Sequence, residues 1–383
     1  LQELIDEDTT AVETELEKAS VGDTFKADKQ QPKRQPLPPQ LPRTEIHHEP
    51  GSTTCACGCK MTRIGEDVSE KLDYEPGRFS VERHIRGKWA CRECETVTQA
   101  PVAPHIIDKG IPTTNLLSQV LVAKYADHLP LYRQENIFAR YGVPISRHTQ
   151  CGWMAACATL LRPLVDVMAA RVKQSKKIHT DDTVVPVLDP TLPHAKKGRF
   201  WAYIGDTSHP YTVYDYTDSR KRDGPQNFLE GYSGYLQADA YAGYDCVYAG
   251  EQVLECGCWA HTRRKFFEAQ STSPKESAHA LATIRRLYMV EREAKPLSAK
   301  ERQQMRDEQS RPVLQTFDTW LQEQQATQLP KSPIMTAVNY TRNQWEALNR
   351  YLDDGDLSID NNESERTVRA QAVGRKNWLF AGS

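Results

Sequence analysis

The spacing of hydrophobic and polar residues changes several times along the chain. From about Asn115 to Lys173 the apolar positions recur with the 3.6-residue period of amphipathic helices, with a stop at Gly142. After Lys177 the spacing becomes that of strands. The predicted elements are strands at 178–188, 199–205 and 211–217, a short helix near Phe228, strands at 235–239 and 253–258, and a helix from His261.

Residues 273–352 return to helical spacing. A Ser298-x-x-Glu301 capping box predicts the start of one helix, and Ser332-Pro333 predicts the start of another that ends at Asp353-Asp354-Gly355. An apolar stripe lies between them: Val313, Leu314, Phe317, Trp320 and Leu321. A last helix is predicted after Asp360-Asn361-Asn362. Three strands, a helix, two more strands and a helix form the element order of an α/β, ribonuclease-H-like fold with a helical insertion at about 270–352.

The N-terminal fifty residues contain too little apolar material for a core. Residues 1–26 carry eight acids against two lysines, which favours a solvated acidic helix, with the tail of a coiled coil as the alternative. Five prolines between Pro32 and Pro42 predict an extended linker. The expected domains are an acidic helix and linker at 1–50, a metal-stapled domain at 51–100, a helical domain at 110–175 and the interrupted α/β domain at 176–383.

Composition narrows the function classes. The 383 residues include 49 Lys plus Arg and 51 Asp plus Glu. The chain therefore has no overall basic excess that would indicate nucleic-acid binding. We find no apolar run of about 18 residues and no signal-peptide pattern, which argues against a membrane span and against secretion and favours a cytoplasmic protein. Because the chain begins with Leu1 instead of Met, we expect a fragment of a longer protein.

Five of the ten cysteines lie between Cys55 and Cys94. Cys91-Arg92-Glu93-Cys94 has the two-residue gap that lets two thiolates bind one zinc ion, and Cys55-Ala56-Cys57-Gly58-Cys59 offers the other half of a tetrahedral site. The upstream ligands are two of Cys55, Cys57 and Cys59, with Cys57 favoured because Gly58 suits a tight turn. His47, His48 and His84 are possible substitutes, and free buried thiols are the alternative.

A second group, Cys256-Gly257-Cys258-Trp259-Ala260-His261, resembles a metal motif only superficially. Strand residues at this alternation usually fill a core, and no further pair of ligands lies nearby in the sequence. We therefore interpret Cys256 and Cys258 as structural. A redox role for the pair is a separate alternative, which would require a reversible disulfide and no affinity for DNA.

The segment 131–146 predicts a helix, a glycine stop and an apolar turn, and a second helix follows through Trp153. This spacing is typical of a helix-turn-helix whose second helix presents its first turn to the major groove of DNA. Ser146 is the expected cap, with Arg147, His148 and Gln150 pointing outward. A helical hairpin that does not contact DNA is the alternative.

Three acids stand out by position. Asp181 lies in the first predicted strand, Asp239 at the end of the fourth, and Glu365 one turn inside the last helix. In a ribonuclease-H-like sheet these strands are adjacent and the helix packs across them, so three carboxylates can converge and bind Mg²⁺ or Mn²⁺ for phosphodiester chemistry. Taken singly, Asp181 and Asp239 fit turns, and Glu365 fits an Asn362-capped helix.

Several segments together resemble the transposases of the bacterial insertion sequence 66 family. They are 65–74 (GEDVSEKLDY), 126–134 (ADHLPLYRQ), 179–183 (HTDDT), 234–241 (GYLQADAY), 258–261 (CWAH) and 360–383, which ends GRKNWLFAGS. The resemblance extends from about Pro50 to Ser383. Two positions depart from the family pattern: Asp182 stands where many members have Glu, and Thr54 stands where the first zinc-binding cysteine aligns.

The resemblance implies a DDE-type transposase with a zinc-binding domain ahead of an interrupted ribonuclease-H-like domain. Its metal-binding triad is Asp181, Asp239 and Glu365, and its substrates are the terminal inverted repeats of the element and target DNA. It also implies a homo-oligomer, accessory proteins encoded by the same element, and a nucleoid-associated location. The residues expected to contact DNA are Arg366, Arg369, Arg375, Lys376, Arg263, Arg264, Lys265 and Arg147. A zinc-dependent DNA-binding regulator with an inactive catalytic fold is the alternative.

Overall fold

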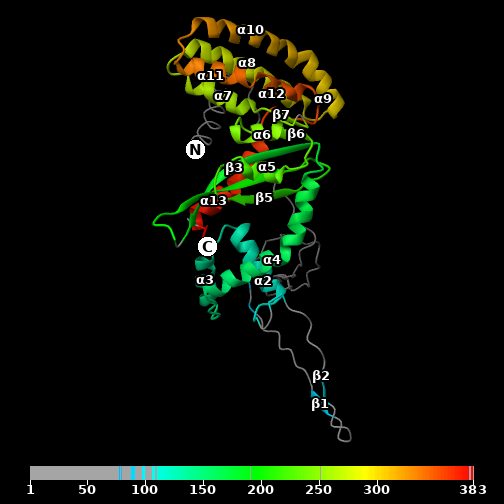
Figure 1. Cartoon of the computed structure of the whole chain (residues 1–383), viewed down its shortest axis with the longest axis vertical. Helices are drawn as coiled ribbons and strands as arrows, with labels where there is room; N and C mark the ends of the chain where they lie inside the picture. The colour runs from blue at the N-terminus through cyan, green and yellow to red at the C-terminus, as the bar shows by residue number, and fades with distance from the viewer. Residues whose placement is uncertain are drawn as a thin grey trace, which may run out of the picture. The chain divides into compact units, whose positions relative to one another are not determined.

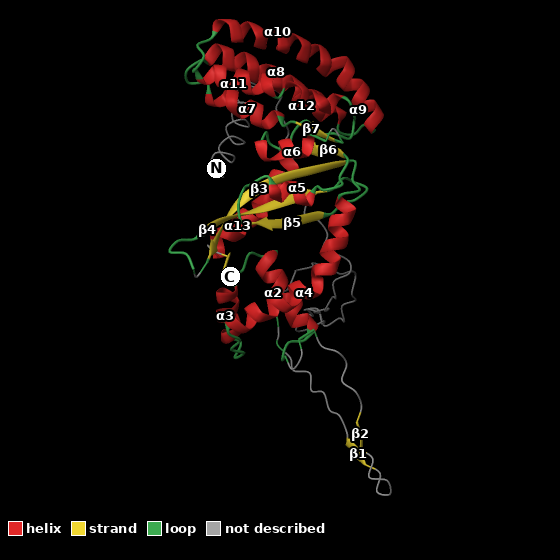
Figure 2. Cartoon of the chain, viewed as in Figure 1, coloured by secondary structure: helices red, strands yellow, loops and turns green. Residues whose placement is uncertain are grey.

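The structure is a computed structural model that describes residues 77, 79, 88–90, 97–99, 106–107, 110–189, 191–250, 252–378 and 381–382. The chain divides into two compact units, Leu1–His84 and Ile85–Ser383, and the helices and strands discussed below all belong to the second (Figures 1 and 2). The predicted acidic helix, the proline-rich linker and the cysteines of the predicted zinc site lie outside the described residues. Strands β1 (Lys88–Ala90) and β2 (Val97–Gln99) form a short antiparallel hairpin.

Among the described residues, three helices precede the main sheet: α2 (Thr114–Tyr125), α3 (Leu131–Arg140) and α4 (Arg147–Val172). The expected caps are present, because Ser146 Oγ accepts a hydrogen bond from the Thr149 amide and Gly142 has a positive φ of 74° at the turn. The prediction that Gln150 points outward is wrong. Its side chain is buried and donates to the Ile145 carbonyl at 3.0 Å, because it shares the face of α4 that packs on α2 and α3.

Helix α4 also corrects the composition argument. Over 26 residues it is long and apolar enough to cross a membrane, by length and composition only. A single helix of this kind is weak evidence, since helices of soluble proteins pass the same test. Its exposed apolar residues are Leu160, Leu161, Leu164 and Val167.

The main sheet has the strand order β5-β4-β3-β6-β7. Its strands are β3 (Lys177–Leu188), β4 (Lys196–Ile204), β5 (Thr212–Thr217), β6 (Gly234–Gln237) and β7 (Val253–Cys256). The first three are antiparallel neighbours, whereas β6 pairs parallel with β3 and β7 pairs parallel with β6. The short β8 (Ala381–Gly382) pairs with the end of β3. All five strands predicted from the spacing are confirmed, with ends that differ by a few residues.

The two faces of the sheet carry different layers (Figure 1). Ile178, Trp201 and Leu236 are fully buried on one face, where Val172 at the end of α4 joins their core. The short helices α5 (Asp223–Phe228), η1 (Ala242–Tyr244) and α6 (Asp245–Tyr248) follow β5 and β6. Residues of β3 with the opposite alternation, His179 and Thr183, contact α13 (Asn362–Trp378), which packs along β3 and β4.

The helical insertion has its own core. It follows α7 (Trp259–Glu268) and comprises α8 (Pro274–Ala294), α9 (Ala299–Met305), a π-helical turn η2 (Arg306–Ser310), α10 (Arg311–Thr327), α11 (Pro333–Asn343), α12 (Trp345–Asn349) and η3 (Arg350–Leu352). The Ser298–Glu301 capping box is present, and Phe317 and Leu321 of the predicted stripe are buried. The single helix predicted from Ser332 is wrong in extent, because α11 ends at Asn343 and shorter helices follow.

A buried ion pair joins the parts of the insertion. The Arg306 side chain is 2% exposed, and its guanidinium binds both carboxylate oxygens of Glu291 at 2.7 Å. The same guanidinium donates to the carbonyls of Tyr351, Asp354 and Leu357 at 2.7–3.0 Å. It therefore links α8, η2 and the loop that leads to α13.

We expect Arg306→Met to destabilise the protein by about 3–5 kcal/mol, because it leaves the Glu291 carboxylate and three carbonyls without their donor. Arg311→Met is the matched control. Arg311 lies one turn later and pairs with Asp307 on the surface, so its loss is expected to cost about 0.5 kcal/mol or less. Urea unfolding of both variants measures the difference, and equal midpoints would contradict a structural role for Arg306.

Candidate active site

Asp181 and Asp239 lie on neighbouring parallel strands. The last paired residues of β3 and β6 are His179 and Gln237. Asp181 and Asp239 each lie two residues beyond this pair, and the Asp239 carboxylate is close enough to raise the pKa of Asp181. Asp181 shares the strand alternation of His179 and Thr183, so it lies on the face on which α13 packs. Glu365, in the first turn of α13, thereby approaches the two aspartates from the helix.

The electrostatics of this group are unfavourable for ionised acids. Burial, with a smaller contribution from the carboxylates of Asp239, Asp182 and Glu365, raises the pKa of Asp181 to about 8, against the lowering effect of a hydrogen bond from the Asp182 amide. Burial also raises the pKa of Asp239, partly offset by the guanidinium of Arg220. Carboxylates crowded in a poorly solvated position form a site that a cation stabilises.

Asp182, the next residue of β3, has a different environment. Its side chain is 3% exposed and lies 2.7 Å from Arg199 and 2.8 Å from Arg220. Arg220 also lies 3.5 Å from Asp239 and stacks over the Tyr241 ring. The two adjacent acids therefore have surroundings of opposite charge. Because side chains alternate along the strand, Asp182 faces two guanidinium groups and Asp181 faces other carboxylates.

Asn361 joins the elements that carry these acids. Its side chain is buried, contacts His179 Nδ1 at 3.0 Å and donates to the Thr180 carbonyl at 2.9 Å. Its backbone amide donates to Cys258 Sγ at 3.2 Å. One residue thus connects β3, the start of α7 and the start of α13. In the sequence, Asn361 is recognisable only as part of a helix-start signal, and this role was not predicted from it.

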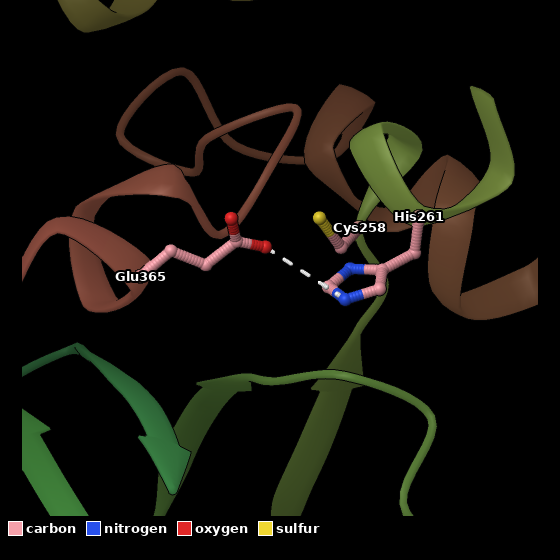
Figure 3. A group of neighbouring side chains, drawn as sticks. All are labelled: Cys258, His261 and Glu365. Atoms are coloured by element: carbon pink, nitrogen blue, oxygen red, sulfur yellow. Dashed lines mark ion pairs between the residues drawn. The ribbon is translucent and has the colours of Figure 1, made fainter. Parts of the chain in front are cut away.

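Cys258, His261 and Glu365 form the tightest group of possible metal ligands among the described residues. One donor atom from each lies within 4.8 Å of the others, and Figure 3 shows the three side chains pointing toward one another. His261 Nε2 is 3.7 Å from Glu365 Oε1. Asp181 and Asp239 do not belong to this group. The carboxylates of Asp239 and Glu365 nevertheless lie close enough to Asp181 to raise its pKa.

Cys256 and Cys258 are both buried, as the structural interpretation predicts. Burial raises the pKa of each thiol to about 12, which leaves both protonated at neutral pH and poorly reactive. The structural interpretation did not predict that His261 and Glu365 lie beside Cys258. Burial lowers the pKa of His261, while the Glu365 carboxylate raises it in part.

The predicted DNA-binding residues fall into three places. On α13, Arg366, Arg369 and Lys376 are exposed, whereas Arg375 donates to Thr183 Oγ1 at 3.3 Å and to the Val184 carbonyl. On α7, Arg263, Arg264 and Lys265 are partly buried, and the Lys265 ammonium lies over the Tyr340 ring. Arg147 is exposed at the start of α4. Basic residues of α7 and α13 therefore follow His261 and Glu365 directly, whereas Arg147 belongs to another element.

Two family models match the chain, and both describe the same family of transposases. The family model described as "Transposase IS66 family" matches residues 109–383, and the one described as "zinc-finger binding domain of transposase IS66" matches residues 52–95. Two similar proteins come from Sinorhizobium fredii (strain NBRC 101917 / NGR234). Uncharacterized protein y4qI is 37% identical over 372 residues, which cover 92% of this chain and 69% of the relative. Uncharacterized protein y4hP is 33% identical over 379 residues, which cover 93% and 68%.

The contrast between Asp181 and Asp182 predicts opposite effects of the same substitution. Without added divalent ions we expect Asp181→Asn to leave stability unchanged or slightly higher, because it removes a desolvated acid among like charges. Asp182→Asn is expected to lose about 2–3 kcal/mol, because it removes the partner of two guanidinium groups. Thermal unfolding followed by tryptophan fluorescence compares the two. A larger loss in Asp181→Asn would show that the electrostatic assignment is wrong.

Proposed function

The chain belongs to the IS66 family of transposases, and we propose that it cleaves the ends of its element and joins them to target DNA in a metal-dependent reaction. The observation that carries the proposal is that the Asp239 and Glu365 carboxylates both raise the pKa of Asp181, while α13, which carries Glu365, packs along β3. Family membership supports a transposase function. The residue assignments rest on the geometry.

The topology supports a ribonuclease-H-like catalytic domain. Three antiparallel strands, β3 to β5, are followed by β6 and β7 in parallel with β3, and α13 returns across β3 and β4 after the insertion. The crossovers bring the first strand beside the fourth. This arrangement accounts for acids that are far apart in the sequence and adjacent on the sheet.

The acids fit a divalent cation by their chemistry. Carboxylate oxygens are the ligands that Mg²⁺ and Mn²⁺ prefer, and the raised pKa values of Asp181 and Asp239 reflect a group of acids that need a positive charge. In the proposal Asp181, Asp239 and Glu365 hold the metal, which when bound activates the attacking oxygen and stabilises the leaving oxygen of a phosphodiester. Arg220 keeps Asp239 in place from the other side.

The remaining work of the chain is to bind and orient DNA. Arg366 and Arg369 follow Glu365 on α13, and Arg263, Arg264 and Lys265 follow His261 on α7, so phosphates bound by these groups lie beside the acids. Lys376 is exposed on the last turns of α13. Arg375 combines a contact to DNA with its bond to β3, and Arg147 serves a separate helix-turn-helix contact. The substrates in this proposal are the terminal inverted repeats and target DNA.

The zinc-finger match at residues 52–95 supports zinc as a further bound metal. In the proposal Cys91, Cys94 and two of Cys55, Cys57 and Cys59 are its ligands. The proposal includes domains at 1–50, 51–100, 110–175 and 176–383. It also includes a homo-oligomer that works with accessory proteins of the same element, at a cytoplasmic, nucleoid-associated location. An inactive DNA-binding regulator is not favoured by the findings.

We expect Asp239→Asn and Glu365→Gln to reduce cleavage of element-end DNA in Mg²⁺ by about 1,000-fold, because each removes a charged ligand from the reacting centre. Binding of the same DNA in a gel-shift assay is expected to persist. Glu363→Gln is the control, since Glu363 lies on the same turn of α13 with a half-exposed side chain. If Asp239→Asn still cleaves at the wild-type rate, the catalytic assignment is wrong.

Replacing a zinc ligand is expected to lower the zinc content of the purified full chain. Cys91→Ser removes one of four ligands, so metal analysis after gel filtration is expected to find one zinc ion fewer per chain. Cys157→Ser, which alters a buried thiol in α4, is the control and is expected to keep its zinc. Unchanged zinc in Cys91→Ser would exclude this residue as a ligand.

A further inference from the structure

Cys258, His261 and Glu365 come from two segments that are remote in sequence. Cys258 immediately precedes α7, His261 lies in the first turn of α7, and Glu365 lies in the first turn of α13. Their donor atoms gather within 4.8 Å and the side chains face one another in Figure 3. We propose that these three residues form a third metal site, which takes a thiophilic divalent ion of the Zn²⁺ class.

The donor set selects the ion. A thiolate, an imidazole and a carboxylate together suit Zn²⁺, whereas Mg²⁺ is bound by oxygen ligands. Three protein ligands leave the fourth position of a tetrahedral ion open, unlike a closed structural site with four. The site therefore differs in kind from both the predicted cysteine-rich finger and the group of carboxylates on the sheet.

The distances suit a small ion. With ligand bonds of about 2.0–2.3 Å, the donors around a tetrahedral Zn²⁺ lie about 3.2–3.8 Å apart. The 3.7 Å between His261 Nε2 and Glu365 Oε1 is within this span and longer than a hydrogen bond. Because all donor pairs lie within 4.8 Å, the sulfur needs to approach by no more than about 1 Å.

The surroundings support a thiolate ligand. The Asn361 amide donates to Cys258 Sγ at 3.2 Å, an outer-shell bond of the kind that stabilises a metal-bound thiolate. When the ion binds, the thiol proton of Cys258 leaves to solvent and the sulfur–metal bond takes its place.

Cys256 shows that burial alone does not create the site. It is as buried as Cys258 and ends β7 two residues earlier, yet it is not part of the group.

An ion held by Cys258 and His261 also uses Glu365 as a ligand. This consequence rests on the proposed function: the ion competes with the catalytic metal for Glu365, and added Zn²⁺ is expected to inhibit cleavage in Mg²⁺.

Cobalt titration of the full chain tests the site directly. Co²⁺ replaces Zn²⁺ in such sites and gives a thiolate-to-metal charge-transfer band in the near ultraviolet. The protein is first loaded with one equivalent of Zn²⁺, which fills the four-ligand finger and leaves the three-ligand site open. Titrating it with Co²⁺ is expected to produce this band in the wild type and in Cys256→Ser, and to lose it in Cys258→Ser. The same band in Cys258→Ser and in the wild type would overturn the proposal, since the signal would then arise from other cysteines.

Because Cys258 is buried, Cys258→Ser can lose the band through a folding defect, so a second variant is needed. His261→Gln alters a partly exposed side chain and is expected to weaken Co²⁺ binding by more than about 10-fold, which is the lower end for loss of an outer-shell partner. Unchanged affinity would also overturn the proposal. Asp239→Asn separates the two hypotheses, because it is expected to abolish cleavage and to keep the cobalt band.

Discussion

The buried amide of Asn361 is the contact on which the arrangement of the site depends. It is 1% exposed, and through its side chain and its backbone amide it bonds to His179, Thr180 and Cys258. A buried amide with hydrogen bonds to several elements can be satisfied in few other arrangements, so such a residue specifies how its neighbours pack. Because α13 begins at the next residue, Asn361 also sets where Glu365 lies relative to β3.

This constraint works against electrostatic repulsion. The packing that places Glu365 near Asp181 and Asp239 crowds acids at a position where burial already disfavours their ionised forms. Opposite charges offset the cost on one side only, where Arg199 and Arg220 bind Asp182 and Arg220 reaches Asp239. On the side that faces α13, Asp181 lies among other carboxylates, and the His261 imidazole lies 3.7 Å from Glu365. Carboxylates that the fold holds together in this way favour the binding of a cation.

The insertion supports the site from the far end of the sheet. Trp259 Nε1 donates to the Leu348 carbonyl at 2.8 Å and the Gly257 amide donates to the Ala347 carbonyl at 2.9 Å, so α12 holds the junction of β7 and α7. A side chain at Gly257 would meet the Leu348 backbone at 3.0 Å, which explains why glycine suits this position. The helices of the insertion thereby fix the segment that carries Cys258 and His261.

The sequence by itself determined the elements of this protein, because period and capping are local properties. The strand spacing after Lys177, the Ser146 cap and the Ser298–Glu301 capping box all predict what the structure contains. The order of strands and the location of Asp181, Asp239 and Glu365 followed from the same pattern, and the recognised motifs identified the family. The assignment of these acids as metal ligands stays a prediction.

Only the tertiary structure decided which remote residues meet. Gln150 is buried because α2 and α3 cover its face of α4, and Arg375 bonds to β3 because α13 lies along that strand. His261 and Cys258 face Glu365 because the crossover from β7 and the long insertion return the chain to the same edge. Sequence spacing carries no information about such a meeting, since register and packing across the whole sheet set the distance between residues that are far apart in the chain.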